Sequence, residues 1–323
     1  MASSRPEAAE RAVGLTVAIP TFRRLELVRG AVDSVVTQST EFPVEVLVID
    51  GDPDGSAVRA LAAAALPANV RVIRTKGAGS SKARNIALEE ARYDVLAFLD
   101  DDAAAEAGWL VEIASAYQDS SVAAAGGPIT PFFTAQPPRW LRDAYDLAEA
   151  EFGALNYGAG PCRLEFPRYL NGPNLSVRRS VGMACGGFRE DLGVHGTRWS
   201  PGEDTDLIRR LQALGHTVMW VPSAAVRHLV TPEKMTRRFL RRRVFAKGMA
   251  TARGGVGDPE DRARSQTSAL PRIAAAIVYH YVLSQVLWVA GNRRGAVLHD
   301  LAWARWLGIM IGRIGQFVQQ TVY

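Results

Sequence analysis

The stretch 94–104, DVLAFLDDDAA, joins a short apolar run to three consecutive acids, Asp100, Asp101 and Asp102. The apolar run is typical of a buried strand that ends at the acids. Carboxylates at this spacing repel one another, and folding by itself gains nothing from placing them together. The acids therefore either lie in water on a turn or surround a positively charged ligand.

The segments around this stretch alternate between strand and helix patterns. Strand patterns occur at 15–22, 44–51, 70–75, 93–100 and 121–129, and helix patterns at 25–38, 56–66, 80–92 and 108–118. This alternation predicts an α/β fold with a mostly parallel sheet and helices on both faces. Ligands of such sheets bind beyond the carboxyl ends of the strands, where Asp50 and Asp100 both fall.

The chain after residue 130 is less regular. Residues 131–170 mix proline, glycine and aromatic residues, which predicts an excursion over one face of the sheet, such as a lid. The further predicted elements are a helix at 202–215, a strand and its exit at 216–230, and apolar helices at 271–291 and 301–318. The expected organisation is a disordered N-terminus (1–14), a main domain (15–250), a linker (251–270) and a C-terminal helical hairpin (271–323).

Composition places the chain among globular proteins without selecting a partner. Of 323 residues, 48% are hydrophobic and 22% charged, and the net charge is +5. This mild basic excess is compatible with a phosphorylated substrate, an anionic membrane or nucleic acid. The two cysteines lack metal-site spacing, which favours a reducing compartment. Residues 1–14 lack the apolar core of a signal peptide, so we expect a cytoplasmic protein.

The three acids suit a divalent cation. Mg2+ and Mn2+ prefer oxygen ligands, commonly one or two carboxylates together with substrate phosphates. A cation bound at this turn would offset the repulsion between the acids and neutralise a departing diphosphate. A solvated acidic turn explains the same three residues if they are considered in isolation.

Seven segments, in their order and spacing, make residues 15–250 similar to the inverting GT-A glycosyltransferases of family two. They are VAIPTFRR, VLVIDGDPDGS, GSSKARNIAL, FLDDDAAAEAGWL, LNGPNLSVRRSVGMACGGF, GEDTDLIRRLQALGH and VPSAAVRH. The resemblance implies a GT-A fold in which 15–130 binds the nucleotide and 131–250 the acceptor. It also implies metal-dependent transfer of a hexose or N-acetylhexosamine from a nucleotide-diphosphate sugar, most often a UDP-sugar, to an acceptor hydroxyl.

The resemblance assigns roles to individual residues. Those implied to contact the nucleotide are Pro20, Thr21, Arg23, Asp50, Arg84, Asp100 and Asp101, and those implied to hold Mg2+ or Mn2+ are Asp102, Asp100 and His228. A guanidinium suits the geometry of phosphate, which favours the role of Arg84. Taken alone, Asp50 is explained by a turn, Arg84 by a helix surface and His228 by a structural histidine.

The acidic pair Glu203-Asp204 opens a predicted helix. The resemblance makes Asp204 the base that deprotonates the acceptor hydroxyl and Glu203 its neighbour that holds the acceptor. Acids at a helix start are also favoured by the helix dipole, which is the structural explanation. The residues implied to contact donor sugar or acceptor are Asn171, Gly172, Asn174 and Trp199, although Trp199 suits core packing equally well.

The C-terminal hairpin is basic and rich in tryptophan. Neither apolar helix is a clean membrane span, because the first carries His280, Ser284 and Gln285 and the second carries Arg305 and Arg313. This pattern favours contact with a membrane surface at the inner face of the cell membrane. Packing on the main domain or in a homodimer is the alternative.

The sequence-based hypothesis is therefore an inverting glycosyltransferase in polysaccharide, glycolipid or natural-product assembly. The expected acceptor is a glycan, a lipid-linked glycan or a small molecule, and no nucleic-acid partner is expected. Two alternatives stay open, namely a nucleotidyltransferase-like enzyme and a catalytically inactive binding module. The first lacks support because the loop IPTFRR carries no glycine. The second conflicts with the acids at positions 102, 203 and 204.

Overall fold

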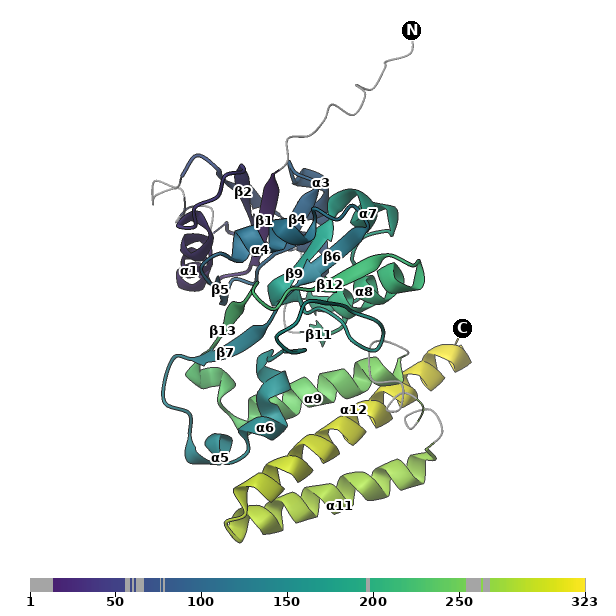
Figure 1. Ribbon diagram of the computed structural model, residues 1–323. Helices are drawn as coiled ribbons and strands as arrows, with labels where there is room; N and C mark the ends of the chain where they lie inside the picture. The colour runs from purple at the N-terminus through teal and green to yellow at the C-terminus, as the bar shows by residue number, and fades with distance from the viewer. Residues whose placement is uncertain are drawn as a thin grey trace.

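The computed structural model describes residues 14–322 apart from 56–58, 60, 62–66, 76, 78, 196–197, 254–262 and 264–267. A large twisted sheet flanked by helices forms the upper body of the molecule, and three long helices form a layer beneath it (Figure 1). Residues 1–13 lie outside the described residues. The same is true of most of the helix predicted at 56–66 and most of the predicted linker.

The main sheet has eight strands. Their order is β3 (Val70–Arg74), β2 (Val44–Asp50), β1 (Leu15–Thr21), β4 (Val95–Phe98), β9 (Leu175–Arg178), β6 (Val122–Gly126), β12 (Thr217–Trp220) and β8 (Cys162–Arg163). Strands β8 and β9 pair antiparallel with their neighbours, and the other described pairs in this sheet are parallel. The predicted mostly parallel α/β sheet is confirmed.

Helices cover both faces of this sheet. One face carries α1 (Leu25–Val36) and α4 (Trp109–Ala116), and the other α3 (Ser80–Glu90), α7 (Arg179–Ala184) and α8 (Glu203–Ala213). Adjacent strand residues point to opposite faces. Val17 therefore packs in the core beneath α1 and Ala18 in the core beneath α3. Burial on both faces explains why β1 and β2 are apolar almost throughout.

A second, three-stranded sheet extends the lower edge of the first. Its order is β5 (Ala103–Ala105), β13 (Val226–Val230) and β7 (Ile129–Phe133). Strand β13 is antiparallel to β5 and places His228 opposite Ala103, immediately after the three acids. The segment predicted as one strand and its exit at 216–230 thus forms two strands in different sheets, because a turn containing Pro222 interrupts the pairing.

The predicted excursion at 131–170 is partly regular. It contains most of β7, the short helices α5 (Arg139–Arg142), α6 (Tyr145–Ala148) and η1 (Glu149–Phe152), and strand β8. The predicted strand at 121–129 ends early, at Gly126. A Cβ on Gly127 would collide with the carbonyl oxygens of Val221 and Ala224, so the chain needs glycine where it passes this turn. The remaining short elements are η2 (Gly172–Asn174), β10 (Gly193–His195), β11 (Arg198–Ser200) and η3 (Pro232–Lys234).

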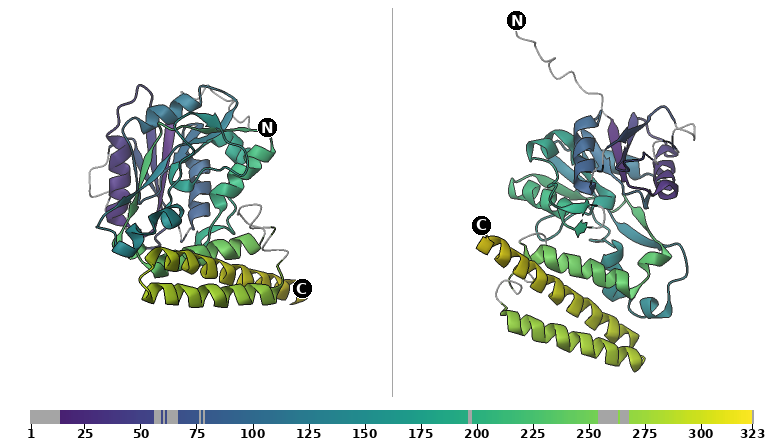
Figure 2. Two further views of the ribbon diagram at one scale, coloured as in Figure 1. Left: turned by 60° about the horizontal axis from the view of Figure 1, so that its bottom comes forward. Right: turned by 180° about the vertical axis from the view of Figure 1, so that it is seen from behind.

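The lower layer consists of α9 (Arg237–Ala252), α11 (Leu270–Val289) and α12 (Arg293–Val322). Helix α12 lies between α9 and α11 (Figure 2). It begins eight residues before the predicted start at 301, because Asn292 caps it through a hydrogen bond from the Gly295 amide (2.9 Å). Gly248 of α9 and Gly308 of α12 let the two backbones approach closely, since a Cβ on either would meet a carbonyl oxygen of the other helix.

We expect Gly308→Ala to lower the free energy of unfolding by about 1–3 kcal/mol, because the added methyl group collides with the Phe245 carbonyl. Gly315→Ala is the matched control on the same helix, since nothing lies within 4 Å of its Cβ position. That control should be neutral or stabilising by up to about 1 kcal/mol. Urea unfolding of both variants measures the difference, and equal effects would contradict the close helix contact.

Candidate active site and metal centre

The acids of the opening stretch form the turn between β4 and β5. This turn lies beside the carboxyl ends of β1 and β2, because β4, β1 and β2 are parallel neighbours. Asp101 and Asp102 are buried, and Asp100 is half-buried. Buried carboxylates need compensating partners, and the structure supplies a different set for each.

Asp102 is surrounded by cationic groups. Its Oδ2 accepts hydrogen bonds from Lys234 Nζ (2.7 Å) and Arg24 Nη1 (3.0 Å), and its Oδ1 lies 3.2 Å from His228 Nε2. Burial alone would raise the pKa of Asp102. The hydrogen bond from His228 and the charges of His228, Lys234 and Arg24 outweigh burial and hold that pKa far below its usual range. Asp102 is therefore ionised at any physiological pH.

Asp101 is shifted in the opposite direction. Its carboxylate accepts hydrogen bonds from Thr21 Oγ1 (2.8 Å) and Arg24 Nη1 (3.1 Å). Burial and the adjacent charge of Asp102 nevertheless raise the pKa of Asp101 to about 6. Thr21 and Arg24 thus tie the end of β1 to the acidic turn.

Asp100, Asp102 and His228 form a candidate metal centre. Each offers one ligand atom, and these atoms lie within 4.8 Å of one another. His228 Nδ1 lies 2.8 Å from the Phe152 carbonyl, which can only accept a hydrogen bond, so Nδ1 carries a proton. Metal-binding histidines commonly donate their other N–H in this way. Nε2, which donates to Asp102, would have to release its proton to bind a cation. Two carboxylates and one such imidazole fit a divalent cation.

Arg84 connects this centre to the second pair of acids. The guanidinium donates to Asp100 Oδ1 (3.1 Å) and Glu203 Oε1 (2.8 Å). Arg84 is buried, which disfavours its charge, but the charges of Asp100 and Glu203 outweigh burial and raise its pKa. The residue is a buried ionic bridge between α3, the acidic turn and α8, and not an exposed helix side chain.

Glu203 and Asp204 begin α8 and point to the same region. Asp204 accepts hydrogen bonds from the Gly172 amide (2.7 Å) and the Thr205 amide (2.8 Å). Burial and the charge of Glu203 raise the pKa of Asp204 to about 6, against the opposing effect of Arg84. A carboxylate with this pKa is a stronger base than an ordinary aspartate. Glu203 Oε1 also accepts a hydrogen bond from Ser80 Oγ (3.2 Å).

The backbone of Gly172 passes directly over these groups. A Cβ there would collide with Arg84 Nη2 and would lie 3.4 Å from Asp204 Oδ2. Asn171 precedes it and is half-buried. Asn174 is fully buried and forms hydrogen bonds with Trp109 Nε1, Pro128 O and Ala224 O, so it fixes the course of this segment.

The other predicted residues occupy the loops around the acids. Pro20 and Thr21 end β1, and Asp50, which is fully buried, ends β2 and accepts a hydrogen bond from the Asp52 amide (2.9 Å). Arg23 has a positive φ of 56° and pairs with Asp52 (3.1 Å). Trp199 lies on β11, paired through its backbone with Val194, and its side chain lies outside the described part of the chain.

Two basic residues at the centre were missed by the sequence analysis. Arg24 bridges Asp101 and Asp102, whereas the prediction named its neighbour Arg23. Lys234 follows β13 on η3 and reaches Asp102 and the Leu229 carbonyl (3.0 Å). Their signal in the sequence was proximity to motif residues, since Arg24 ends IPTFRR and Lys234 lies six positions after His228.

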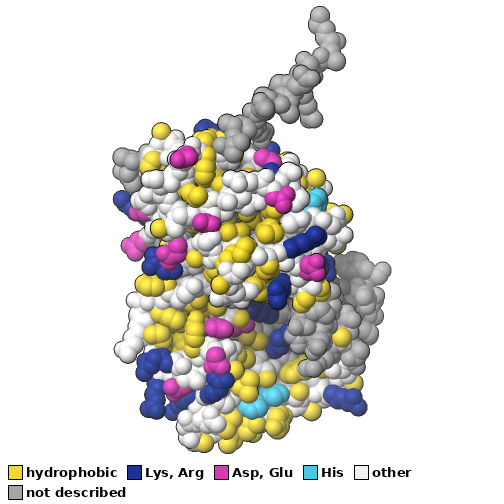
Figure 3. Space-filling view, viewed as in Figure 1, with side chains coloured by type: hydrophobic (Ala, Val, Ile, Leu, Met, Phe, Trp, Pro, Cys, Tyr) yellow, Lys and Arg dark blue, Asp and Glu magenta, His cyan; other side chains and the backbone are white. Residues whose placement is uncertain are grey.

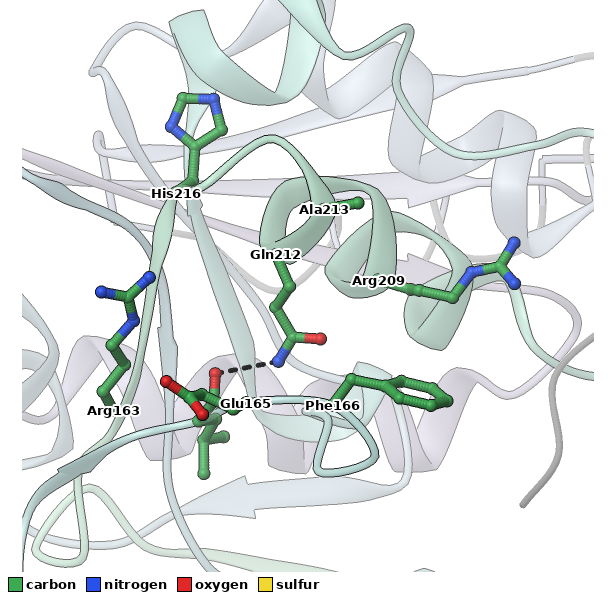
Figure 4. Close-up of a pocket in the computed structure, with 8 residues that line it drawn as sticks. Arg163, Glu165, Phe166, Arg209, Gln212, Ala213 and His216 are labelled. Carbon is green, nitrogen blue, oxygen red and sulfur yellow. Dashed lines mark hydrogen bonds between the residues drawn. The ribbon is translucent and has the colours of Figure 1, made fainter. Parts of the chain in front are cut away.

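A separate pocket lies at the far end of α8. Its lining residues include Arg163, Glu165, Phe166, Arg209, Gln212 and His216, which Figure 4 shows around the opening. Gln212 and Ala213 lie eight and nine residues after Asp204 on this helix, or about 12–14 Å along its axis at a rise of 1.5 Å per residue. The pocket is therefore distinct from the acidic centre.

Comparison with known proteins assigns the chain to one family. Residues 16–192 match the family model described as "Glycosyl transferase family 2". The match contains the ends of β1, β2 and β4, Arg84 and the Gly172 segment, while Glu203, Asp204 and His228 lie beyond its end.

Two curated relatives cover about two thirds or more of the chain. The succinoglycan biosynthesis protein ExoM of Rhizobium meliloti is 25% identical over 250 residues, or 74% of each chain. The glucosyl-dolichyl phosphate glucuronosyltransferase of Haloferax volcanii is 27% identical over 219 residues, which cover 67% of this chain and 68% of the relative.

A solved structure has the same fold. The mannosyltransferase PcManGT of Pyrobaculum calidifontis, in complex with GDP-Man and Mn2+, superposes with a TM-score of 0.54 at 19% identity, over 94% of this chain and 87% of that protein. At this identity the likeness shows the GT-A fold alone.

Proposed function

Because this chain is a glycosyltransferase of glycosyl transferase family 2, we propose that it transfers a sugar from a nucleotide-diphosphate sugar to an acceptor hydroxyl with the help of Mg2+ or Mn2+. The observation that carries the proposal is the ionic bridge of Arg84. This residue joins the candidate metal centre at Asp100 to the acidic pair at Glu203, so donor and base sites adjoin one another.

Asp102, Asp100 and His228 would hold the cation, which supplies positive charge to the departing diphosphate when bound. Arg24 and Lys234 contribute further positive charge at the same place, since both form ion pairs with Asp102. We assign them to the diphosphate as well, since ammonium and guanidinium groups both bind phosphate oxygens.

The nucleoside would lie over the ends of β1 and β2, where Pro20, Thr21, Arg23 and Asp50 gather. A UDP-sugar is our first choice of donor. GDP- and dTDP-sugars are the alternatives, and a GDP-sugar is the ligand of the mannosyltransferase of the same fold.

Transfer proceeds with inversion at the anomeric carbon. The acceptor oxygen attacks from the side opposite the diphosphate while Asp204 takes its proton. The new C–O bond forms as the bond to the diphosphate breaks, and that electron pair leaves with the diphosphate. Glu203 binds the acceptor or orients Asp204, and Asn171 and Gly172 form the adjoining wall. No covalent sugar–enzyme intermediate is required, because a single base suffices.

Assembly of a polysaccharide or glycolipid is the biosynthetic role that the relatives support best. The Rhizobium protein is named for succinoglycan biosynthesis, and the Haloferax enzyme acts on a glucosyl-dolichyl phosphate. We therefore propose a glycan or lipid-linked glycan as the acceptor and the cytoplasmic face of a membrane as the place of action, with a small-molecule acceptor as the alternative.

A thermal-shift series tests the metal–nucleotide site. UDP, GDP, dTDP and CMP are each added with and without Mn2+, and one of them should stabilise the protein by about 2.7 kcal/mol at a hundred times its dissociation constant. The stabilisation should require Mn2+ and be lost in Asp102→Asn. Asp143→Asn, an exposed acid on the surface pair with Arg139, should retain it. Stabilisation by no nucleotide, or equal stabilisation of the two variants, would contradict the proposed site.

A further inference from the structure

The outer face of α11 is apolar along its whole length. This helix is the outermost element of the lower layer and packs mainly on α12 (Figures 1 and 2). Its inner side also contacts Arg237 of α9 through Ser284 (3.1 Å) and Trp140 of α5 through Trp288 (6.5 Å between ring centroids). It contains no acidic residue. Its exposed large side chains are Leu270, Val278, Tyr279, Tyr281, Val282, Val286 and Val289. A contiguous apolar face of this kind usually marks a site of contact with protein or membrane.

The inner side of α11 is tied to charged groups. Buried Ser284 donates a hydrogen bond to Asp300 of α12 (2.6 Å), and Asp300 pairs with Arg237 (2.5 Å) and Arg241 (2.8 Å) of α9. Among the described helices, α11 alone is long and apolar enough to cross a membrane. A transmembrane orientation would carry this ionic network into hydrocarbon or break it, and either is costly. The geometry therefore favours α11 lying along a bilayer surface.

Both ends of the apolar face carry cations. Arg272 lies in the first turn of α11, and Arg293 follows its last turn and lies over the Trp288 ring, whereas the next residue, Arg294, is paired with Asp146. In the space-filling view, hydrophobic side chains gather along the lower edge of the molecule around histidine side chains, with basic side chains to either side and acidic ones among those on the left (Figure 3). If two α11 helices packed side by side in either direction, a cationic end would meet a cationic end. An anionic bilayer complements both ends and the apolar length at once.

We propose that α11 docks in the plane of an anionic bilayer, with Val278, Val282 and Val286 at the acyl boundary and Arg272 and Arg293, at its two ends, on lipid phosphates. Tyr279 and Tyr281 lie beside the valines, and tyrosine is enriched at the boundary between acyl chains and head groups. The docked molecule lies flat, with α12 and α9 stacked above α11.

In this docked orientation, the acidic turn at Asp100–Asp102 and the acidic pair Glu203-Asp204 lie on the side of the main sheet that faces the membrane. The carboxyl ends of the parallel main-sheet strands, such as β1 and β4, point toward the helical layer (Figure 1). The candidate metal ligand His228 is held by Phe152, whose ring stacks on Phe239 of α9 (6.3 Å between centroids). Given the proposed function, this arrangement fits an acceptor presented on a membrane lipid.

Vesicle sedimentation of the full chain tests the docking. We expect the protein to bind phosphatidylcholine vesicles that contain about 30% of the anionic lipid phosphatidylglycerol. Added salt should weaken this binding. The double variant Val282→Glu/Val286→Glu should bind at least about tenfold less, because two charges enter the apolar boundary. Leu214→Glu is the control, since Leu214 is an even more exposed apolar residue far from α11.

Three outcomes would overturn the proposal. One is equal vesicle binding by the double variant and the wild type. Another is a dimer in light scattering that the double variant abolishes while neither protein binds vesicles, which would assign the face to a second copy. The third is wild-type protein that resists extraction from membranes at alkaline pH, which would indicate a spanning helix. The nucleotide thermal shift should be the same in both proteins, so failure of docking and failure of the proposed function are separable.

Discussion

Asp204→Asn should lower the turnover number about 10²- to 10⁴-fold, the usual contribution of a general base. The asparagine side chain has the same shape but a single acceptor oxygen, so it can keep one of the two hydrogen bonds that Asp204 Oδ2 and Oδ1 accept from the Gly172 and Thr205 amides, and it cannot take a proton. The nucleotide thermal shift should therefore be retained. Release of the nucleoside diphosphate from the donor, followed in the presence of acceptor, measures the loss.

The pH dependence of turnover identifies the base. Ionised Asp204 is the active form, and its pKa is raised to about 6, so turnover should fall as the pH drops through that value. The pKa of Asp101 is also raised to about 6, so the fall in turnover at low pH can be assigned to Asp204 only with the Asp204→Asn variant. The residual activity of Asp204→Asn should not show this fall at low pH. Asp206→Asn is the control on the same helix, because Asp206 pairs with Arg210 (2.8 Å) and should alter turnover only a few-fold. A large loss in the control alone would remove Asp204 from the mechanism.

Arg84→Met should be the most destabilising single change at the site. Removing one partner of a buried ionic cluster leaves uncompensated charges, here on Asp100 and Glu203, at a cost of about 3–5 kcal/mol in the free energy of unfolding. Denaturant unfolding above pH 7 measures the effect. Arg92→Met is the matched control, since Arg92 is well exposed in its pair with Glu45 and should cost at most about 1 kcal/mol.

The same substitution should also shift the pH profile. The positive charge of Arg84 lowers the pKa of Asp204, so its removal raises that pKa further and moves the acidic limb of turnover to higher pH. The double variant Arg84→Met/Glu203→Gln should recover part of the lost stability, because it removes one of the stranded charges. A single variant as stable as the wild type would show that the bridge is solvated and not buried.

Much of the fold was predictable because the local patterns agree with the tertiary structure. Strands buried on both faces, such as β1 and β2, need uninterrupted apolar residues, and parallel strands bring Asp50 and Asp100 to one edge without further information. The acidic turn could be located for the same reason. The predicted family, fold and enzyme class are confirmed.

The rest depended on contacts that sequence patterns do not encode. The register of β13 against β5 sets His228 beside the acids, and no periodicity specifies it. The positive φ of Arg23 directs its side chain to Asp52, so Arg24 faces the acidic turn instead. Lys234 reaches Asp102 only because η3 folds back after β13. The roles assigned to the site residues by resemblance stay predictions until the variants are measured.

The glycine contact between α9 and α12 has a geometric consequence. Because Gly248 and Gly308 bring the backbones together and Asp300 ties in α11, the three helices form a block of fixed thickness. Axes of directly packed helices lie about 8–10 Å apart, so α12 stands about that far above α11, and α9 is near enough to α11 for Arg237 to donate to Ser284 (3.1 Å). With α11 on a bilayer, as proposed, this block would hold the main sheet at a fixed height above the lipid. On the proposed mechanism, that height would determine how far an acceptor's terminal sugar must extend from the lipid to reach Asp204, so acceptors should be selected by length.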